Sequence, residues 1–459
     1  MKYEEKSMEH IIAFAKSKGF VYPSSEIYDG FAGAYDFGPR GVELARAIKR
    51  QWWKDMVDVH PHVYGLDSTI VSHSEVWVAS GHVGGFSDPL ADCRVCQSRI
   101  RVDKALEAVG VSADEKMSEE VINKLFDTKR DEIACPSCGS KDFTEARAFN
   151  MLVTSNLGDF TSDNSNPTYL RGETAQGIFI NFKNVVDSIH PKIPFGIAQI
   201  GKAFRNEISP RQFLFRTREF EQMEMQYFVE PGTDAPAYEE WKEKRWNSLL
   251  ALGLSADNLR WNQHDNLVFY AKDAWDIEYN YPDYGFDEME GLHMRGDYDL
   301  SQHAQHSGKE LVFNDNGNKF VPHVVETSVG MGRLFLAVLS EAYDKEELED
   351  GDERTVLRFA PHIAPTQVAI MPLMKKDGLA EIAQEVFAAC APNFRTTYDE
   401  SGSVGKRYRR QDEIGTPLCV TVDYDTKEDN TVTVRNRDTM EQARVSIDEL
   451  HKYLESALR

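Results

Sequence analysis

The stretch FGIAQIGKAFRNEISPRQFLFRTREFEQMEMQYFV, residues 195–229, predicts two strands joined by a polar loop. Its first part is apolar up to Phe204, a turn follows around residues 209–212, and a second run from Phe215 alternates with period two. Successive strand side chains point to opposite faces, which separates a polar face from a core face. The polar face carries Arg218, Phe220, Gln222, Glu224 and Gln226, and the core face carries Met223, Met225, Tyr227 and Val229. Such a strand is either the solvated half of a hairpin or the floor of a site for a flat polar ligand.

The charged residues around the loop favour the second interpretation. Arg205 and Glu207 precede the loop, and Arg216, Arg218 and Phe220 follow it. This order resembles the second signature motif of class II aminoacyl-tRNA synthetases, an Arg-x-Glu followed by a loop and an Arg-rich segment ending in Phe. The resemblance implies that Arg205 contacts the α-phosphate of ATP and that Phe220 stacks on adenine. A fixed guanidinium suits this role, because negative charge develops when a carboxylate attacks a phosphoryl group.

A later segment, residues 321–342, predicts a strand ending at Glu326, a turn with two glycines, and a helix opened by Arg333. This order resembles the third class II motif, in which the arginine holds the γ-phosphate. The resemblance places an ATP and magnesium contact at Glu288, and magnesium prefers one or two carboxylates together with phosphate oxygens. The complete set of ATP-binding residues that it implies is Arg205, Asn206, Glu207, Phe215, Arg216, Thr217, Arg218, Glu219, Phe220, Glu288, Met289, Gly330, Met331, Gly332 and Arg333.

Three further segments are similar to the homodimeric glycyl enzymes of this class: RGETAQG at 171–177, FEQME at 220–224 and ETSVG at 326–330. The resemblance implies ATP-dependent formation of glycyl-adenylate, followed by transfer of glycine to tRNA(Gly), with Arg205 and Arg333 as the catalytic residues. The glycine-binding residues that it implies are Arg101, Glu173, Phe220, Glu221, Gln222, Met223, Glu224, Arg295, Glu326, Thr327, Ser328, Val329 and Gly330. A pocket crowded by carboxylates can hold an ammonium group and exclude alanine by size.

The segment before these motifs predicts a helix from Pro39 to about Val57 and a strand from Asp67 to Trp77. The helix is either an ordinary core-facing helix or, by the resemblance, part of the first class II motif at a dimer interface. The family usually has proline where this chain has Ser74 and Gly172. Ser74 therefore weakens the motif as evidence for a dimer, and Gly172 predicts a looser turn beside Glu173.

Four cysteines form two C-x-x-C pairs around a predicted helix at 118–129. Paired thiolates on tight turns are typical of a structural zinc site, because four thiolate ligands leave no open position on the metal. Thiols that remain reduced, in an insertion without metal, are the alternative. The proposed zinc ligands are Cys93, Cys96, Cys135 and Cys138.

An acidic run at 346–353 predicts a linker to a smaller unit in which strands and helices alternate. This unit resembles the anticodon-binding domain shared by the glycyl, histidyl, prolyl and threonyl enzymes. The densest basic cluster of the chain lies there, and it is either a solvated helix face or a tRNA contact. Its members are Lys406, Arg407, Arg409 and Arg410.

The fold class expected is α/β (α+β), with an antiparallel catalytic sheet, a four-cysteine insertion and a C-terminal α/β domain. The boundaries expected are 1–92 and 148–345 for the catalytic parts, 93–147 for the insertion, 346–360 for the linker and 361–459 for the last domain. The chain has 459 residues, enough for several cores, and 41% of them are hydrophobic.

The charged N-terminal segment and the absence of any long apolar run lead us to expect a cytoplasmic protein. A net charge of −23 excludes binding to nucleic acid through overall charge, so any tRNA contact requires a local basic patch. Three competing hypotheses remain: a prolyl, threonyl or histidyl enzyme, an unrelated zinc-containing adenylating enzyme, and a binding protein that keeps the fold without the chemistry. The last would be expected to lack Arg205 or Arg333.

Overall fold

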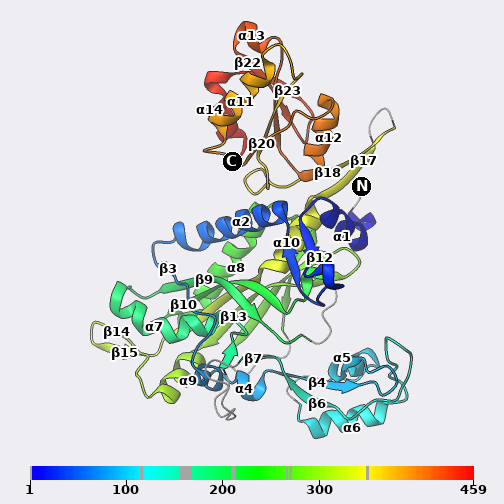
Figure 1. The fold of residues 1–459 in the computed structure, drawn as a ribbon. Coiled ribbons are helices and arrows are strands. Elements are labelled where there is room, and N and C mark those ends of the chain that lie inside the picture. Colours follow the sequence, from blue (N-terminus) through cyan, green and yellow to red (C-terminus); the bar gives the residue numbers. More distant parts are fainter. Residues whose placement is uncertain are drawn as a thin grey trace.

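A seven-stranded sheet forms the centre of the molecule in a computed structural model that describes residues 3–113, 117–155, 168–207, 213–264, 267, 271–347 and 351–459 (Figure 1). Its strand order is β11-β12-β13-β16-β10-β9-β3. The predicted hairpin is confirmed: β9 (Phe195–Phe204) and β10 (Glu219–Val229) pair antiparallel, between the middle strand β16 and the edge strand β3. The expected turn at 209–212 lies outside the described residues.

The remaining strands of this sheet are β3 (Val63–Gly65), β11 (Leu259–Gln263), β12 (Asp273–Tyr281), β13 (Gly285–Gly296) and β16 (His323–Gly330). Its neighbours along the chain are α1 (Met8–Ser17), β1 (Val21–Pro23), β2 (Tyr35–Phe37), α2 (Pro39–Trp53), α3 (Ser74–Ala79), α4 (His82–Gly85), β7 (Val153–Ser155), β8 (Thr168–Leu170), α7 (Ala175–Ile189), α8 (Asp234–Ala251), α9 (Tyr298–Ser307), β14 (Phe313–Asp315), β15 (Asn318–Phe320) and α10 (Met331–Ala342).

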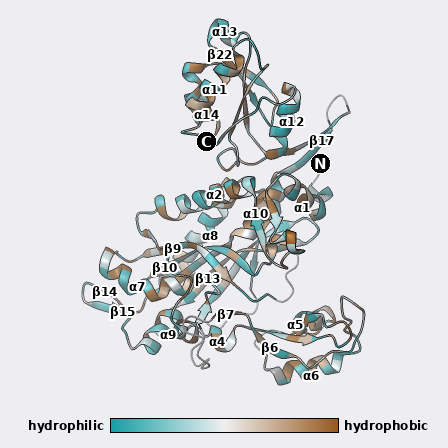
Figure 2. Cartoon of the chain, viewed as in Figure 1, coloured by the Kyte–Doolittle hydropathy of each residue, from teal (hydrophilic) through white to brown (hydrophobic). Residues whose placement is uncertain are grey.

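The apolar helix α10 anchors the third motif in the core. Leu334, Phe335, Val338 and Leu339 are all buried, as the apolar spacing predicts. Figure 2 shows this helix as a largely hydrophobic segment inside the main body. The preceding strand runs to Gly330, four residues beyond the predicted end at Glu326, because residues 327–330 continue the pairing with β10.

The predicted strand from Asp67 to Trp77 is wrong. Its second half is helix α3, and His73 caps this helix by accepting a hydrogen bond from the backbone N–H of Glu75. Trp77 is buried, so the apolar residues that suggested a strand serve a short helix instead. Ser74 is the first residue of α3, a position that suits proline and also tolerates serine. The departure from the family therefore leaves the helix intact.

The insertion is a separate small body in Figure 1 with its own apolar core. It contains β4 (Ser87–Asp92), β5 (Arg99–Arg101), α5 (Val102–Ala108), α6 (Glu119–Lys129) and β6 (Arg147–Asn150). The sheet takes in residues 87–150, a few residues more at each end than the expected 93–147. Helix α6 is confirmed, with Ser118 as its capping residue.

The expected linker is largely a two-stranded ribbon. β17 (Tyr343–Glu347) pairs antiparallel with β18 (Glu353–Leu357), and residues 348–350 lie outside the described residues. The side chain of Arg354 is buried and donates to the carboxylate of Asp412 (2.9 Å) and to the carbonyl of Arg437 (2.6 Å) in the C-terminal domain. The acidic composition predicted a linker. Lys345 and Arg354 pair with acidic residues of the opposite strand, and these ion pairs join the two strands of the ribbon.

The C-terminal domain is a five-stranded sheet of order β20-β19-β21-β22-β23 covered by helices. The predicted alternation of strands and helices is confirmed, and only the strand β23 and the short helix α13 were not predicted. Its elements are β19 (Val368–Pro372), α11 (Leu379–Cys390), β20 (Thr396–Tyr398), α12 (Val404–Ile414), β21 (Leu418–Val422), α13 (Thr426–Asp429), β22 (Thr431–Asn436), β23 (Gln442–Ser446) and α14 (Ile447–Ala457). No helix in the described parts of the chain has the length and hydrophobicity needed to span a bilayer.

Candidate active site

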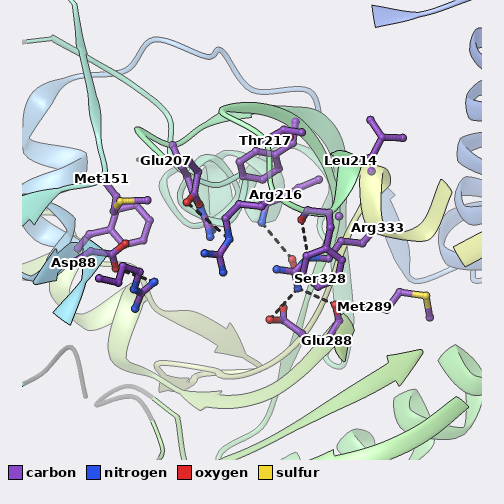
Figure 3. Close-up of a pocket in the computed structure, with 18 of the residues that line it drawn as sticks. Asp88, Met151, Glu207, Leu214, Arg216, Thr217, Glu288, Met289, Ser328 and Arg333 are labelled. Carbon is purple, nitrogen blue, oxygen red and sulfur yellow. Dashed lines mark hydrogen bonds and ion pairs between the residues drawn. The ribbon is translucent and has the colours of Figure 1, made fainter. Parts of the chain in front are cut away.

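A polar cavity of about 410 Å³ lies between the central sheet, the start of α10 and the base of the insertion (Figure 3). It collects residues from segments far apart in the sequence. The predicted site residues that line it are Arg101, Arg205, Glu207, Phe215, Arg216, Thr217, Phe220, Gln222, Glu288, Met289, Ser328, Gly330, Gly332 and Arg333. The lining residues that were not predicted are Gly85, Phe86, Ser87, Asp88, Met151 and Leu214.

Arg205 is fixed between two aromatic rings at the end of β9. The centre of its guanidinium lies 5.2 Å from the ring of Phe86 and 5.3 Å from the ring of Phe220. Its Nε also donates to the carbonyl oxygen of Gly172 at 3.1 Å. Ring faces attract a cation, so the two rings and the carbonyl hold this arginine in one orientation. The cavity therefore presents a preorganised positive charge.

A second arginine reaches the same cavity from α10. Arg333 forms an ion pair with the carboxylate of Glu288 at 3.0 Å and lies over the ring of Phe215, 4.4 Å from its centre. The positive charge of Arg333 lowers the pKa of Glu288, which keeps this carboxylate ionised. A Cβ on Gly332 would lie 2.6 Å from the carbonyl oxygen of Leu214, so the glycine permits the close approach that brings Arg333 to the cavity.

Glu288 and Glu290 face opposite sides of the sheet, although their spacing predicts a shared face. The pairing of β12 with β13 shifts there, because Ile277 pairs with Glu290 and Glu278 with Glu288, so Met289 is an extra residue. Glu288 consequently lines the cavity, while Glu290 is fully buried against the guanidinium of Arg245. Glu288 is thus an exposed acid in an ion pair with Arg333, whereas Glu290 is paired in the core.

A group of buried carboxylates lies deeper, where β10 and β16 pair. Glu326 accepts hydrogen bonds from Arg295 at 2.7 Å and from Gln226 at 2.6 Å, and His293 contacts its other oxygen at 2.7 Å. Burial acts to raise the pKa of Glu326, but Arg295 and His293 outweigh it and hold this pKa at about 2. Glu326 therefore stays anionic although it is buried.

Glu224 lies beside Glu326 and behaves differently. Its carboxylate accepts a short hydrogen bond from the hydroxyl of Thr174. Burial, together with the charges of Glu326 and Glu173, raises the pKa of Glu224 well above its usual value. The group therefore favours its neutral form until a cation arrives, which makes it a natural partner for an incoming ammonium group.

Glu173 lines a neighbouring cavity of about 300 Å³. Burial acts to raise its pKa, but His82, Arg295 and Gln176 outweigh this effect, and the pKa of Glu173 lies below its usual value. The residues that support these carboxylates, His82, Gln176, Gln226, His293 and Asp299, were not predicted. His82, Gln226 and His293 have partners far away in the sequence, so no spacing signals them. Gln176 and Asp299 lie three and four residues from Glu173 and Arg295, a local spacing that could have indicated them.

Several predicted site residues point away from both cavities. Side chains of Glu221, Met223, Thr327 and Val329 lie on the opposite face of the sheet, because they alternate with Gln222, Glu224, Ser328 and Gly330. Arg218 is bound to backbone carbonyls of Ala32 and Glu207, and Glu219 pairs with Lys202. Met331 is buried in the core, and Asn206 is absent from the cavity lining. The side chains of these residues thus depart from the predicted set.

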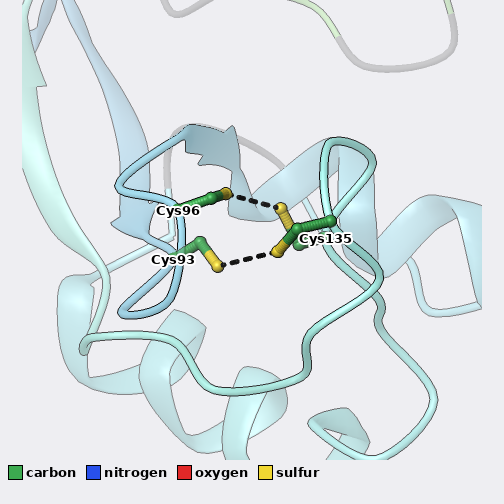
Figure 4. A group of neighbouring side chains, drawn as sticks. Cys93, Cys96 and Cys135 are labelled. Carbon is green, nitrogen blue, oxygen red and sulfur yellow. Dashed lines mark hydrogen bonds between the residues drawn. The ribbon is translucent and has the colours of Figure 1, made fainter.

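The four cysteines of the two C-x-x-C pairs come together in the insertion (Figure 4). Their sulfur atoms all lie within 4.8 Å of one another, and the pairs Cys93–Cys138 and Cys96–Cys135 are each 3.6 Å apart. Four sulfurs at about 2.3 Å from a tetrahedral zinc ion would be about 3.8 Å apart. The donor set and its geometry therefore fit zinc.

The basic cluster on α12 is only partly available to a ligand. Arg407 is 2% exposed, and its guanidinium donates to the carbonyls of Pro372, Leu373 and Asp399. The prediction that Arg407 contacts tRNA is therefore wrong, because its guanidinium is buried and hydrogen-bonded inside the domain. Lys406, Arg409 and Arg410 remain exposed, and the last two form ion pairs with Asp352 and Asp399.

Two family descriptions match the chain. Residues 159–342 match "tRNA synthetase class II core domain (G, H, P, S and T)", and residues 367–457 match "Anticodon binding domain". A solved structure of prolyl-tRNA synthetase from Cryptosporidium parvum, in complex with L-proline and AMP, superposes with a TM-score of 0.62. It covers all of this chain and 77% of that one, and at 15% identity it supports the fold.

Curated relatives are similar over almost their entire length. The glycine–tRNA ligase of Clostridium tetani is 50% identical over 98% of both chains. The glycine–tRNA ligase of Clostridium acetobutylicum is 51% identical over 99% of this chain and the whole of the relative. At this identity and coverage, the chain belongs to the glycine–tRNA ligase family of class II aminoacyl-tRNA synthetases.

Proposed function

We propose that this enzyme joins glycine to tRNA(Gly) through glycyl-adenylate, with ATP in the 410 Å³ cavity and glycine beside the buried carboxylates. The observation that carries the proposal is that Arg205 and Arg333 line one cavity from different segments, and that Gln222 and Ser328 of its lining lie two residues along β10 and β16 from Glu224 and Glu326. Two cations suit a triphosphate, and an anionic pocket suits an ammonium group. The competing idea of a binding protein without chemistry loses its support, because both arginines reach the cavity.

The chemistry follows from charge and position. The glycine carboxylate attacks the α-phosphorus, the bond from that phosphorus to the bridging oxygen breaks, and pyrophosphate leaves. Arg205 stabilises the charge that develops on the α-phosphate, Arg333 binds the γ-phosphate and Phe220 stacks on adenine. Magnesium would be held by Glu288 together with phosphate oxygens, and when bound it neutralises the charge of the phosphates. The terminal ribose hydroxyl of the tRNA then attacks the glycyl carbonyl and AMP leaves. A covalent enzyme intermediate is therefore not required.

Glycine-dependent exchange of labelled pyrophosphate into ATP tests this function. We expect exchange with glycine and at least about 100-fold less with alanine, because a methyl group has no room among the carboxylates. Comparable exchange with alanine would contradict the size argument. Exchange with proline, threonine or histidine instead of glycine would contradict the assigned substrate.

We also propose that tRNA binds along the exposed face of α12. Lys406, Arg409 and Arg410 supply positive charge on a domain that matches the anticodon-binding description, and the net charge elsewhere is negative. The Asp partners of the two arginines would be exchanged for phosphates on binding. Arg407 maintains the fold of α12 and does not take part.

A structural zinc ion in the insertion is a further proposal. We expect about one zinc ion per chain in the purified protein and its loss on replacing Cys135 with serine, since three thiolates bind zinc less tightly than four. Metal analysis measures the zinc content. Limited proteolysis of residues 87–150 measures whether the insertion loosens when zinc is lost. Cys419, buried in the C-terminal domain, provides the matched serine control. Equal zinc content in both variants would contradict the site.

A homodimer is proposed from the family and from the position of the first motif. β3 is an edge strand of the central sheet, and it follows α2, the helix predicted to belong to the first motif. An edge strand has unpaired backbone groups, so a second subunit provides a natural cover.

A further inference from the structure

His82 lies next to the glycine pocket, outside the three class II signature motifs, in a glycine-rich segment at 79–93 that is also similar to the glycyl enzymes. It is the first residue of the short helix α4, just before the insertion. Its Nε2 lies 3.4 Å from Oε2 of Glu173, and its Nδ1 lies 2.8 Å from the hydroxyl of Ser80. Both side chains of the first contact are largely buried, with 13% and 15% exposed. His82 therefore touches one of the carboxylates assigned to the glycine ammonium.

The contacts of Glu173 divide between its two oxygens. His82 faces Oε2, while the side-chain amide of Gln176 donates to Oε1 at 2.9 Å. Gln176 is itself held by Asp299 at 3.1 Å and by His303 at 2.7 Å. A carboxylate with a neighbour on each oxygen has one preferred orientation, and each oxygen retains a lone pair for an ammonium group.

The imidazole is held as firmly as its partner. The ring of Trp77 lies 5.3 Å from it and the ring of Phe86 lies 5.1 Å from it, both edge-to-face. The side-chain amide of Asn150 donates to the carbonyls of His82 and Val83 at 3.3 and 2.9 Å. The hydroxyl of Ser80 contacts Nδ1 at 2.8 Å and leaves Nε2 facing Glu173, so the ring directs a proton at Glu173 whenever Nε2 carries one, as it always does in the charged form.

The same short segment also supports Arg205. Phe86 packs on its guanidinium, and Arg205 donates to the carbonyl of Gly172, the residue before Glu173. A Cβ on Gly172 would lie 3.4 Å from the ring of Phe86. The segment 82–86 thus contacts Glu173 through His82 at one end and Arg205 through Phe86 at the other.

We propose that His82 is a positioning residue for glycine, which orients Glu173 to receive the ammonium group by donating a hydrogen bond from Nε2. This inference rests on the proposed function and assigns a role to a residue outside the predicted set. His82 touches Glu173 and not the reacting atoms, so it acts on the binding of glycine more than on the chemical step. His82 itself is not among the residues that line the larger cavity, so we expect a much smaller effect on the binding of ATP.

Steady-state pyrophosphate exchange with His82→Leu and His82→Gln tests the proposal. Leucine fills the volume without a donor, whereas the amide of glutamine can place an N–H near the position of Nε2. We expect KM for glycine to rise about 10- to 100-fold in His82→Leu and to stay within about 5-fold in His82→Gln. KM for ATP should change less than about 2-fold in both variants, and His10→Leu, an exposed position on α1, provides the matched control.

The position of Glu173 allows a second, independent check. If His82 acts through Glu173, adding His82→Leu to Glu173→Gln should raise KM for glycine by less than about 3-fold, because the two changes remove the same interaction. Equal losses in His82→Leu and His82→Gln, a parallel rise in KM for ATP, or additive effects in the double variant would overturn the proposal. Absence of exchange in the unmodified enzyme would instead contradict the proposed function, so the two failures are distinguishable.

Discussion

Replacing Arg205 with alanine is expected to lower kcat/KM for glycine-dependent pyrophosphate exchange about 10³-fold. The guanidinium is already fixed by Phe86, Phe220 and the carbonyl of Gly172, so no reorganisation is needed when charge develops on the α-phosphate. Its removal takes away the cation assigned to the α-phosphate, while the other arginines of the cavity remain. Labelled-pyrophosphate exchange at saturating and limiting ATP measures the loss and separates kcat from KM.

Arg218→Ala is the matched control for this experiment. Arg218 lies on the same hairpin and was assigned to ATP from the sequence, yet its side chain is bound to backbone carbonyls of Ala32 and Glu207. We expect a loss of less than about 10-fold, which reflects local loosening and not lost charge stabilisation. An equal loss in both variants would restore the original assignment of Arg218.

Replacing Arg245 with methionine should lower the free energy of unfolding of the main body by about 3–5 kcal/mol. Arg245 and Glu290 are 1% and 0% exposed, and their ion pair lies between α8 and the central sheet. The substitution leaves Glu290 as a buried charge without its partner. Urea denaturation followed by tryptophan fluorescence measures the effect, because Trp241 and Trp246 lie on the same helix.

Two comparisons make the stability prediction specific. The double variant Arg245→Met, Glu290→Met should recover most of the loss, since an apolar pair of similar volume needs no charge compensation. Lys183→Met removes one partner of the Lys183–Asp187 pair, in which both side chains are more than half exposed, and should cost less than about 1 kcal/mol. A small effect of Arg245→Met, similar to that of Lys183→Met, would contradict the account.

The central hairpin could be predicted because its alternation is a local property of the sequence. Arg205, Phe220 and Arg333 could also be predicted, because each belongs to a segment whose residue order resembles a known motif. The bulge at Met289 could not, since the shift in pairing depends on the partner strand and separates Glu288 from Glu290. His82 and His293 were missed for a related reason: their partners, Glu173 and Glu326, are distant in the sequence.

Composition alone did not reveal the structure of two charged segments. Arg407 counted as one of four exposed cations, but its position on α12 turns it inward to three backbone carbonyls. The acidic run at 346–353 was expected to be a linker, although the basic residues around it complete a paired ribbon. In both cases the decisive partners come from other parts of the fold.

The ribbon of β17 and β18 has a consequence for the substrate. Arg354 bonds to Asp412 and Arg358 to Asp438, both in the C-terminal domain, while Arg358 also holds Asp344 on the first strand. A paired connection that is also bonded to the C-terminal domain restricts how far this domain can move from the pocket proposed to activate glycine. A tRNA carries its acceptor end and its anticodon at opposite ends of a stiff molecule. We therefore expect the ribbon to restrict the lengths of nucleic acid that can reach both sites, independently of any base that the chain contacts.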